Sequence, residues 1–145
     1  MDMKRIIIGT IVGGIILELL YYLVFDTMFG AYYVANTVSP SVLKIPNLHW
    51  AIAVNVFAGA LLVTLGLEAK AGTPSVANGF VTGAVIGLLV WIQGDFYYYA
   101  ATNTFQLVIA IIDPLLSAIV LGIGGAVIAA VLARMPRTAG FQPAE

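Results

Sequence analysis

Carboxylates are the groups most able to do chemistry in this sequence, because four of its seven acidic residues map to the same half of the long apolar segments. They are Glu18, Asp26, Asp95 and Asp113. An ionised carboxylate surrounded by hydrocarbon is costly, and the interiors of these segments hold no lysine or arginine. We therefore expect such groups to be protonated, to bind a cation, or to accept hydrogen bonds from neutral donors.

Two of these carboxylates are predicted at a similar depth. Glu18 precedes Asp26 by eight residues, about 12 Å along a helix, and Asp113 follows Phe105 by the same number. Both then lie near the middle of a membrane, where an acidic residue is a candidate functional group. The alternative for both is a neutral, hydrogen-bonded group that joins helices. For Asp26 and Asp95 a solvated helix end is the favoured interpretation, and a place in a ligand- or cation-binding pocket is the alternative.

Neutral hydrogen-bond donors occur on the same segments. Tyr22 follows Glu18 by one helical turn, so the two share a face. Tyr98 belongs to a run of three tyrosines and offers an aromatic face to a cation, although tyrosine is also enriched at membrane interfaces. The remaining candidate donors are Tyr21, Asn55, Gln93 and Ser117.

The elements that position these side chains follow from the composition. Of the 145 residues, 61% are hydrophobic and only 9% are charged, so the chain cannot present an ordinary water-facing surface. Four apolar segments are long enough to cross a bilayer. Without period-two alternation they predict helices, hence an all-α membrane protein with a four-transmembrane-helix bundle. The spans are about 6–25, 50–67, 76–98 and 105–133, in one domain of residues 1–137 followed by a flexible tail, 138–145.

The connections between the spans predict the orientation. Segment 27–49 is long and partly apolar, which indicates an interfacial helix, while Pro40 and Pro46 prevent a continuous one. Segment 69–75 is short and polar. Five of the six basic residues flank one side of the spans, and Lys44 alone lies on the other. The positive-inside rule then places both termini in the cytoplasm.

Spans one and three share a pattern of glycines followed by aromatic residues around an aspartate, which suggests two repeated helical hairpins. The alternative is that membrane helices commonly carry small residues and aromatic ends. Residues spaced by four form two ridges of the kind that lets helices approach closely. One ridge is Gly79, Gly83 and Gly87, and the other is Ala118, Gly122, Ala126 and Ala130.

The composition also argues against several classes of protein. The chain has no cysteine and one histidine, so thiolate and histidine metal sites are not expected. Its net charge of −1, without basic clusters, argues against nucleic acid as a partner. We find no nucleophile–base pair, so an enzyme is not expected, and no cofactor is indicated.

The stretch "GAVIGLLVWIQGDFYYYAATNTF", followed by a helix with a central "IIDP", resembles spans three and four of small bacterial four-span membrane proteins of unknown function. Asp26 at the end of span one also fits their pattern, whereas Pro114 and the long first loop depart from it. The resemblance implies a fold and no established activity. The glutamate in span one is similar to that of small multidrug-resistance transporters, but the surrounding motifs do not match.

Three hypotheses follow. The first is an outward-facing acidic and aromatic pocket that binds or transports a proton, a cation or an amine. The second is a non-catalytic subunit or assembly factor of a larger membrane complex. The third, a small lipid- or quinone-directed membrane enzyme, ranks last. Four helices leave little room for a translocation path, so a homodimer or a membrane-complex subunit is the expected partner besides the bilayer.

Overall fold

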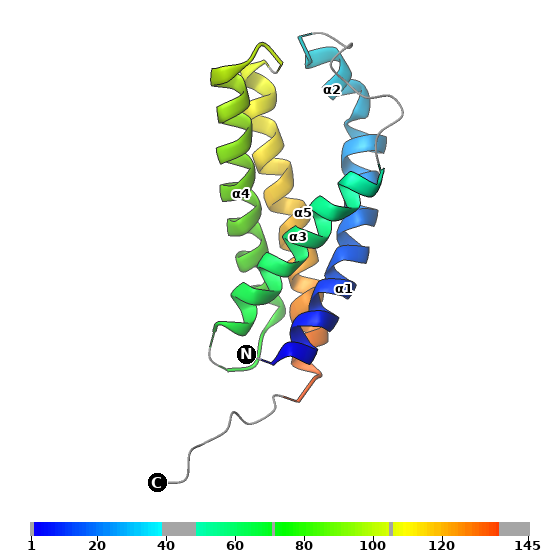
Figure 1. The fold of residues 1–145 in the computed structure, drawn as a ribbon, viewed down its shortest axis with the longest axis vertical. Helices are drawn as coiled ribbons and strands as arrows, with labels where there is room; N and C mark the ends of the chain where they lie inside the picture. Colours follow the sequence, from blue (N-terminus) through cyan, green and yellow to red (C-terminus); the bar gives the residue numbers. More distant parts are fainter. Residues whose placement is uncertain (1, 39–48, 71, 105, 137–145) are drawn as a thin grey trace.

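A computed structural model describes residues 2–38, 49–70, 72–104 and 106–136 of the chain. Their principal elements are helical, and four of the helices are long and apolar enough to cross a membrane. In chain order the elements are α1 (Met3–Tyr21), the π-helix η1 (Tyr22–Met28), α2 (Gly30–Asn36), α3 (His49–Glu68), α4 (Val76–Ala101) and α5 (Leu107–Ala133). The long helices form one bundle (Figure 1).

The predicted all-α, four-helix architecture is confirmed. The first span is longer than predicted, because η1 continues α1 as far as Met28. α2 lies within the predicted interfacial segment 27–49, whereas Pro40 and Pro46 lie outside the described residues. The tail at 138–145 also lies outside them.

The outer surface of the bundle is apolar, as a surface facing lipid must be. One stripe on α1 and one on α5 consist of aliphatic residues spaced by four, each 41–62% exposed. They are Ile7, Ile11, Ile15 and Leu19 on α1, and Ile111, Leu115, Ile119 and Ile123 on α5. With four spanning helices, these stripes make the chain a multi-pass membrane protein.

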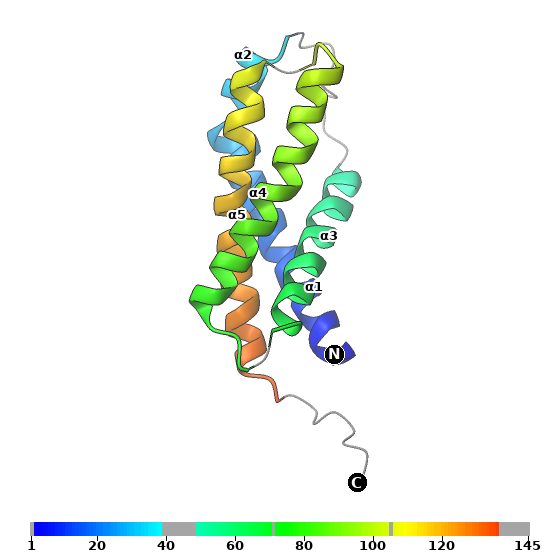
Figure 2. The ribbon, with the colours of Figure 1, turned by 90° about the vertical axis from the view of Figure 1, so that its left-hand side faces the viewer.

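α4 and α5 pack backbone to backbone. A methyl group added to Gly79, Gly83 or Gly87 would overlap the carbonyl of Gly125, Leu121 or Ser117, respectively. The ridge predicted on α4 is therefore used for close packing. The helices cross at this contact and diverge toward the turn that joins them (Figure 2).

The ridge predicted on α5 lies beside the closest contact. Gly122 faces the ring of Phe80 on α4, and the ridge that comes nearest to the α4 glycines is Ser117, Leu121, Gly125 and Ala129. Both candidate ridges are spaced by four and rich in small residues, so spacing alone did not distinguish them. Bulky Leu121 is accepted because its backbone, rather than its side chain, meets Gly83.

One end of the bundle, here called the Arg5 end, holds the start of α1 and the ends of α3 and α5. Arg5 is 1% exposed, and its Nε and Nη2 both donate to Glu68 Oε1, at 3.0 and 2.9 Å. Its Nη1 donates to the carbonyls of Leu132, at 2.8 Å, and Met135. Those carbonyls end α5 and lack the usual partners within the helix, so one guanidinium joins three helices.

The opposite end, here called the cavity end, holds η1, α2, the start of α3 and the α4–α5 turn (Figure 1). α3 begins at His49 well below the turn, so it covers only part of α1 (Figure 1). α2 is held against the turn by the backbone hydrogen bond from Val38 N to Thr104 O, at 3.3 Å. The predicted hairpins α1–α3 and α4–α5 are therefore unequal, because α3 covers only part of α1, whereas α4 and α5 are of nearly equal length and meet at a short turn.

Candidate functional site: an acidic, aromatic cavity

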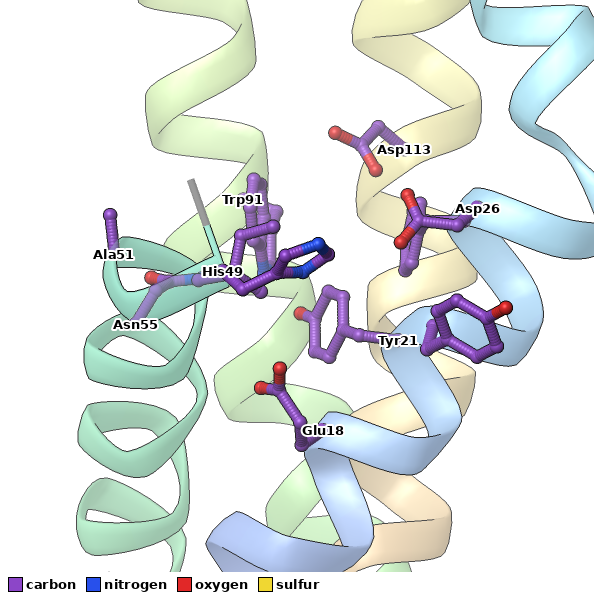
Figure 3. A pocket seen from close by; sticks show the side chains of 11 residues that line it. Glu18, Tyr21, Asp26, His49, Ala51, Asn55, Trp91 and Asp113 are labelled. Atoms are coloured by element: carbon purple, nitrogen blue, oxygen red, sulfur yellow. The ribbon is translucent and has the colours of Figure 1, made fainter. Parts of the chain in front are cut away.

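A cavity of about 420 Å³ opens at the cavity end, between α1–η1, α3, α4 and α5 (Figure 3). Its volume lies within the range of small-molecule sites. Part of its wall is aromatic: Tyr21, Tyr22, Phe25 and Trp91. Its polar side chains are Glu18, Asp26, His49, Asn55 and Asp113. Five of the predicted site residues therefore meet here: Glu18, Tyr22, Asp26, Asn55 and Asp113.

Three carboxylates line this one cavity, and none of its described lining residues is lysine or arginine. Figure 3 shows the carboxylates of Asp113 and Asp26 on the same side, with Glu18 deeper. Glu18 Oε2 is buried and has no hydrogen-bond partner among the described residues. The imidazole of His49 extends from the α3 side toward Asp26 (Figure 3).

The π-helix η1 explains how Glu18 and Asp26 come to line the same cavity. In an unbroken α-helix, a residue eight positions on lies about 80° further around the axis. A π-helix has wider turns, which reduce this offset. The wider turn is visible in the backbone hydrogen bond from Phe29 N to the carbonyl of Val24, five residues earlier, at 2.9 Å. Asp26 is exposed, in keeping with the expected helix end.

Asp95 corrects the expectation of a solvated helix end, since it is only 3% exposed. It lies six residues before the end of α4 at Ala101, and Asp113 lies six residues after the start of α5 at Leu107. The hairpin thus places both at the same level, and their carboxyl groups lie within hydrogen-bonding reach of each other. The pair at equal depth is therefore Asp95 and Asp113, whereas Glu18, which was predicted at the depth of Asp113, lies deeper in the cavity (Figure 3).

The spacing of the helix ridges contained the signal for this pair. Asp95 continues the α4 ridge, eight residues beyond Gly87, and Asp113 continues the α5 ridge, four residues before Ser117. Residues spaced by four share a helix face. The two carboxyl groups therefore face each other for the same reason that the two ridges do.

Tyr33 is the functional residue that the sequence did not reveal. Its hydroxyl donates to Asp113 Oδ1 at 2.8 Å, from α2 and across 80 positions of sequence. Burial, and next the charge of Asp113, raise the pKa of the Tyr33 hydroxyl above its ordinary value. The hydroxyl therefore keeps its proton and serves as a donor. A tyrosine in a short connecting segment carries no periodic signal that could have indicated this contact.

Tyr21 connects the cavity wall to α5. Its ring stacks on Phe25 at a centroid distance of 4.9 Å and lies 6.2 Å from that of Trp91. Its hydroxyl lies near Ser117 and Trp91, although Ser117 Oγ has no hydrogen-bond partner among the described residues. The ring is thus fixed by neighbours on three helices, and it offers the cavity a rigid aromatic face. Such faces attract cations.

Two predicted site residues lie elsewhere. Gln93 is exposed and does not line the cavity. Tyr98 is 51% exposed on α4, beside Tyr97, and also does not line it. The aromatic wall comes instead from α1, η1 and α4, at Tyr21, Tyr22, Phe25 and Trp91.

The fold and the cavity together define the class: a polytopic α-helical membrane protein with an acidic, aromatic-walled cavity near one end of its spans. Comparison with protein-family models, curated proteins and solved structures finds no match for this chain. The function is therefore argued from the cavity itself.

Proposed function

We propose that the protein binds a small organic cation, of the amine or quaternary ammonium class, in this cavity. The observation that carries the proposal is the convergence of Glu18, Asp26 and Asp113 on one aromatic-walled space, with Glu18 Oε2 buried and unpartnered. A cation supplies the charge that the described lining lacks. Aromatic faces add about 0.5–2 kcal/mol for each well-placed contact.

The spread of the carboxylates favours an organic cation over a bare metal ion. Among the described residues, no three histidine, aspartate or glutamate side chains lie close enough together to ligate one metal. Separate anionic positions around a space of about 420 Å³ suit a ligand of several atoms, whose charge and apolar parts meet different walls.

The orientation belongs to the same proposal. Lys4, Lys70 and Arg134 all lie at the Arg5 end of the bundle, and the positive-inside rule assigns that end to the cytoplasm. The cavity then opens on the outer side of a bacterial inner membrane. Because the chain contains no cysteine, Asn103→Cys and Ser75→Cys can be labelled with a membrane-impermeant maleimide without background. In intact cells only Asn103→Cys should react; the reverse result contradicts the orientation.

Binding can be measured by the fluorescence of Trp91, which lines the cavity. The chain has two tryptophans, and Trp50→Phe leaves Trp91 as the sole reporter. Benzyltrimethylammonium, titrated into this variant in lipid nanodiscs, should change the emission saturably, whereas neutral benzyl alcohol should not. Glu18→Gln should weaken binding about tenfold, the equivalent of 1.4 kcal/mol.

Two tyrosines provide a matched control for the aromatic wall. Tyr22 and Tyr98 are both more than half exposed, but only Tyr22 lines the cavity. Tyr22→Leu should weaken binding of benzyltrimethylammonium, and Tyr98→Leu should leave it unchanged. Equal binding of benzyl alcohol, or full affinity in a variant combining Glu18→Gln and Asp26→Asn, would show that the cavity is not a cation site.

A further inference from the structure

Asp113 belongs to two arrangements at once. Its carboxyl faces the cavity (Figure 3), and it also lies within hydrogen-bonding reach of Asp95, which does not line the cavity. Asp95 is 3% exposed and Asp113 is 7% exposed. A charged ligand in the cavity can therefore affect the carboxyl group of Asp95 through that of Asp113.

The contact between the two carboxyl groups requires a proton. Carboxylate oxygens only accept hydrogen bonds, so two carboxyl groups can bond to each other only if one carries a hydrogen. Asp95 Oδ2 is buried and has no hydrogen-bond partner among the described residues. Two adjacent ionised carboxylates at this burial would repel each other strongly, as in known carboxyl dyads.

The groups around the pair supply hydrogen bonds and further negative charge. Tyr33 on α2 donates to Asp113, and Tyr21 on α1 lies nearby. Across the cavity are Glu18, Asp26 and His49. Among these facing groups His49 can become positive, and the carboxylates of Glu18 and Asp26 can also take up a proton, so the test must separate all three from the aspartate pair.

We propose that Asp95 and Asp113 together hold one proton, and that a cation entering the cavity displaces it. The second half of this statement rests on the proposed function. The exchange balances: one positive charge enters, the proton leaves the pair through Asp113 into the water of the cavity, and the pair becomes doubly ionised beside the bound cation. The protein would then couple binding of an organic cation to release of a proton.

The first experiment needs no ligand. Infrared spectra of the protein in lipid should show the C=O stretch of a protonated carboxylic acid at neutral pH, shifted in D₂O. Asp95→Asn should remove this band, because the introduced amide can donate to Asp113 in place of the proton. Glu18→Gln should keep it. A wild-type spectrum without the band, or a band that persists in both Asp95→Asn and Asp113→Asn, overturns the shared proton.

The second experiment measures the coupling. Benzyltrimethylammonium carries a permanent charge, so any dependence of its affinity on pH reports on the protein. Displacement of one proton should raise the affinity by up to about tenfold for each pH unit. In Asp95→Asn the dependence should disappear, with the affinity at low pH matching the wild-type value at high pH.

Variants of the other titratable groups in the cavity separate the possible carriers of the proton. His49→Gln, Glu18→Gln and Asp26→Asn should each retain the pH dependence if the proton resides on the Asp95–Asp113 pair; its loss in one of these variants assigns the effect to that group and overturns the coupling. A protonated carboxyl band without any binding of benzyltrimethylammonium would instead refute the proposed function and leave the shared proton standing.

Discussion

At the Arg5 end, Glu68 is 3% exposed and its carboxylate meets a guanidinium that also donates to two carbonyls at the end of α5. At the cavity end, Asp95 and Asp113 are similarly buried, but the described groups around them are a tyrosine hydroxyl and each other's carboxyl. The first end compensates its buried charge with the protein's own cation. On our proposals, the second end leaves that compensation to a proton or a ligand.

The difference separates stability from function within one small bundle. A buried charge with a fixed partner joins helices, and its removal mainly affects folding. Buried carboxylates without a fixed cation lower stability, and they persist where they serve binding. Removal of a buried glutamate should therefore have opposite effects on stability at the two ends.

The largest effect is expected at Arg5. Arg5→Met leaves Glu68 buried and without its guanidinium, and it removes donors from the carbonyls of Leu132 and Met135. Breaking one side of a buried ion pair costs about 3–5 kcal/mol. Unfolding by SDS in mixed micelles should show this loss. Lys4→Met, at the exposed neighbouring position, should change stability by less than about 0.5 kcal/mol. Equal effects of the two substitutions would show that the contacts of Arg5 with Glu68 and the two carbonyls do not stabilise the fold.

A smaller loss is expected from the ridge that brings Asp95 and Asp113 together. A methyl group at Gly83 would overlap the backbone of Leu121, so Gly83→Ala must force α4 and α5 apart. Overpacking of this kind costs about 1–3 kcal/mol. Gly94→Ala is the matched control on the same helix, because a methyl group there meets nothing within 4 Å.

The control should be neutral or stabilising, since alanine favours a helix over glycine. SDS unfolding measures both variants, and the infrared carboxyl band reports on the aspartate pair. Gly83→Ala should alter that band, and Gly94→Ala should leave it unchanged. An unaltered band in a destabilised Gly83→Ala protein would show that the aspartate pair does not depend on the ridge.

Sequence and structure differ most where contacts cross between helices. Hydropathy predicted all four spans, because a lipid environment demands long apolar helices. It also predicted that Glu18, Asp26 and Asp113 fall in the same half of the bundle, since depth follows from position along a helix. The rotation of a helix about its own axis relative to its neighbours does not follow from position along the chain. A shift of one residue in the α5 ridge therefore hid the Asp95–Asp113 pair, and the approach of Tyr33 depends on how α2 folds back.

Tyr33→Phe tests whether α2 contributes to the cavity end. It removes the hydroxyl that donates to Asp113 and leaves a buried acceptor without that donor, at a cost of about 1–3 kcal/mol. Hydrogen exchange of the amides in α2 should become faster. Tyr32→Phe is the adjacent control, since the ring of Tyr32 meets those of Phe29 and Tyr33 without any recorded contact to Asp113. Equal protection of α2 in both variants would mean that the Tyr33–Asp113 bond does not hold it in place.

The smallest predicted change in unfolding free energy distinguishes the two ends most clearly. Removal of a glutamate should stabilise the protein at the cavity end and destabilise it at the Arg5 end. Glu18→Met removes a carboxylate whose Oε2 is buried and unpartnered, so it should stabilise the ligand-free protein by about 0.5–2 kcal/mol. Glu68→Met makes the same chemical change on α3, where it leaves Arg5 buried without its anion, and it should destabilise. SDS unfolding of both variants measures whether each substitution raises or lowers the stability of the protein. Benzyltrimethylammonium should stabilise the wild-type protein in proportion to its binding, and this increment should be lost in Glu18→Met. If both glutamates stabilise the fold, Glu18 is a structural group, and the cavity end neutralises its charge as completely as the Arg5 end does.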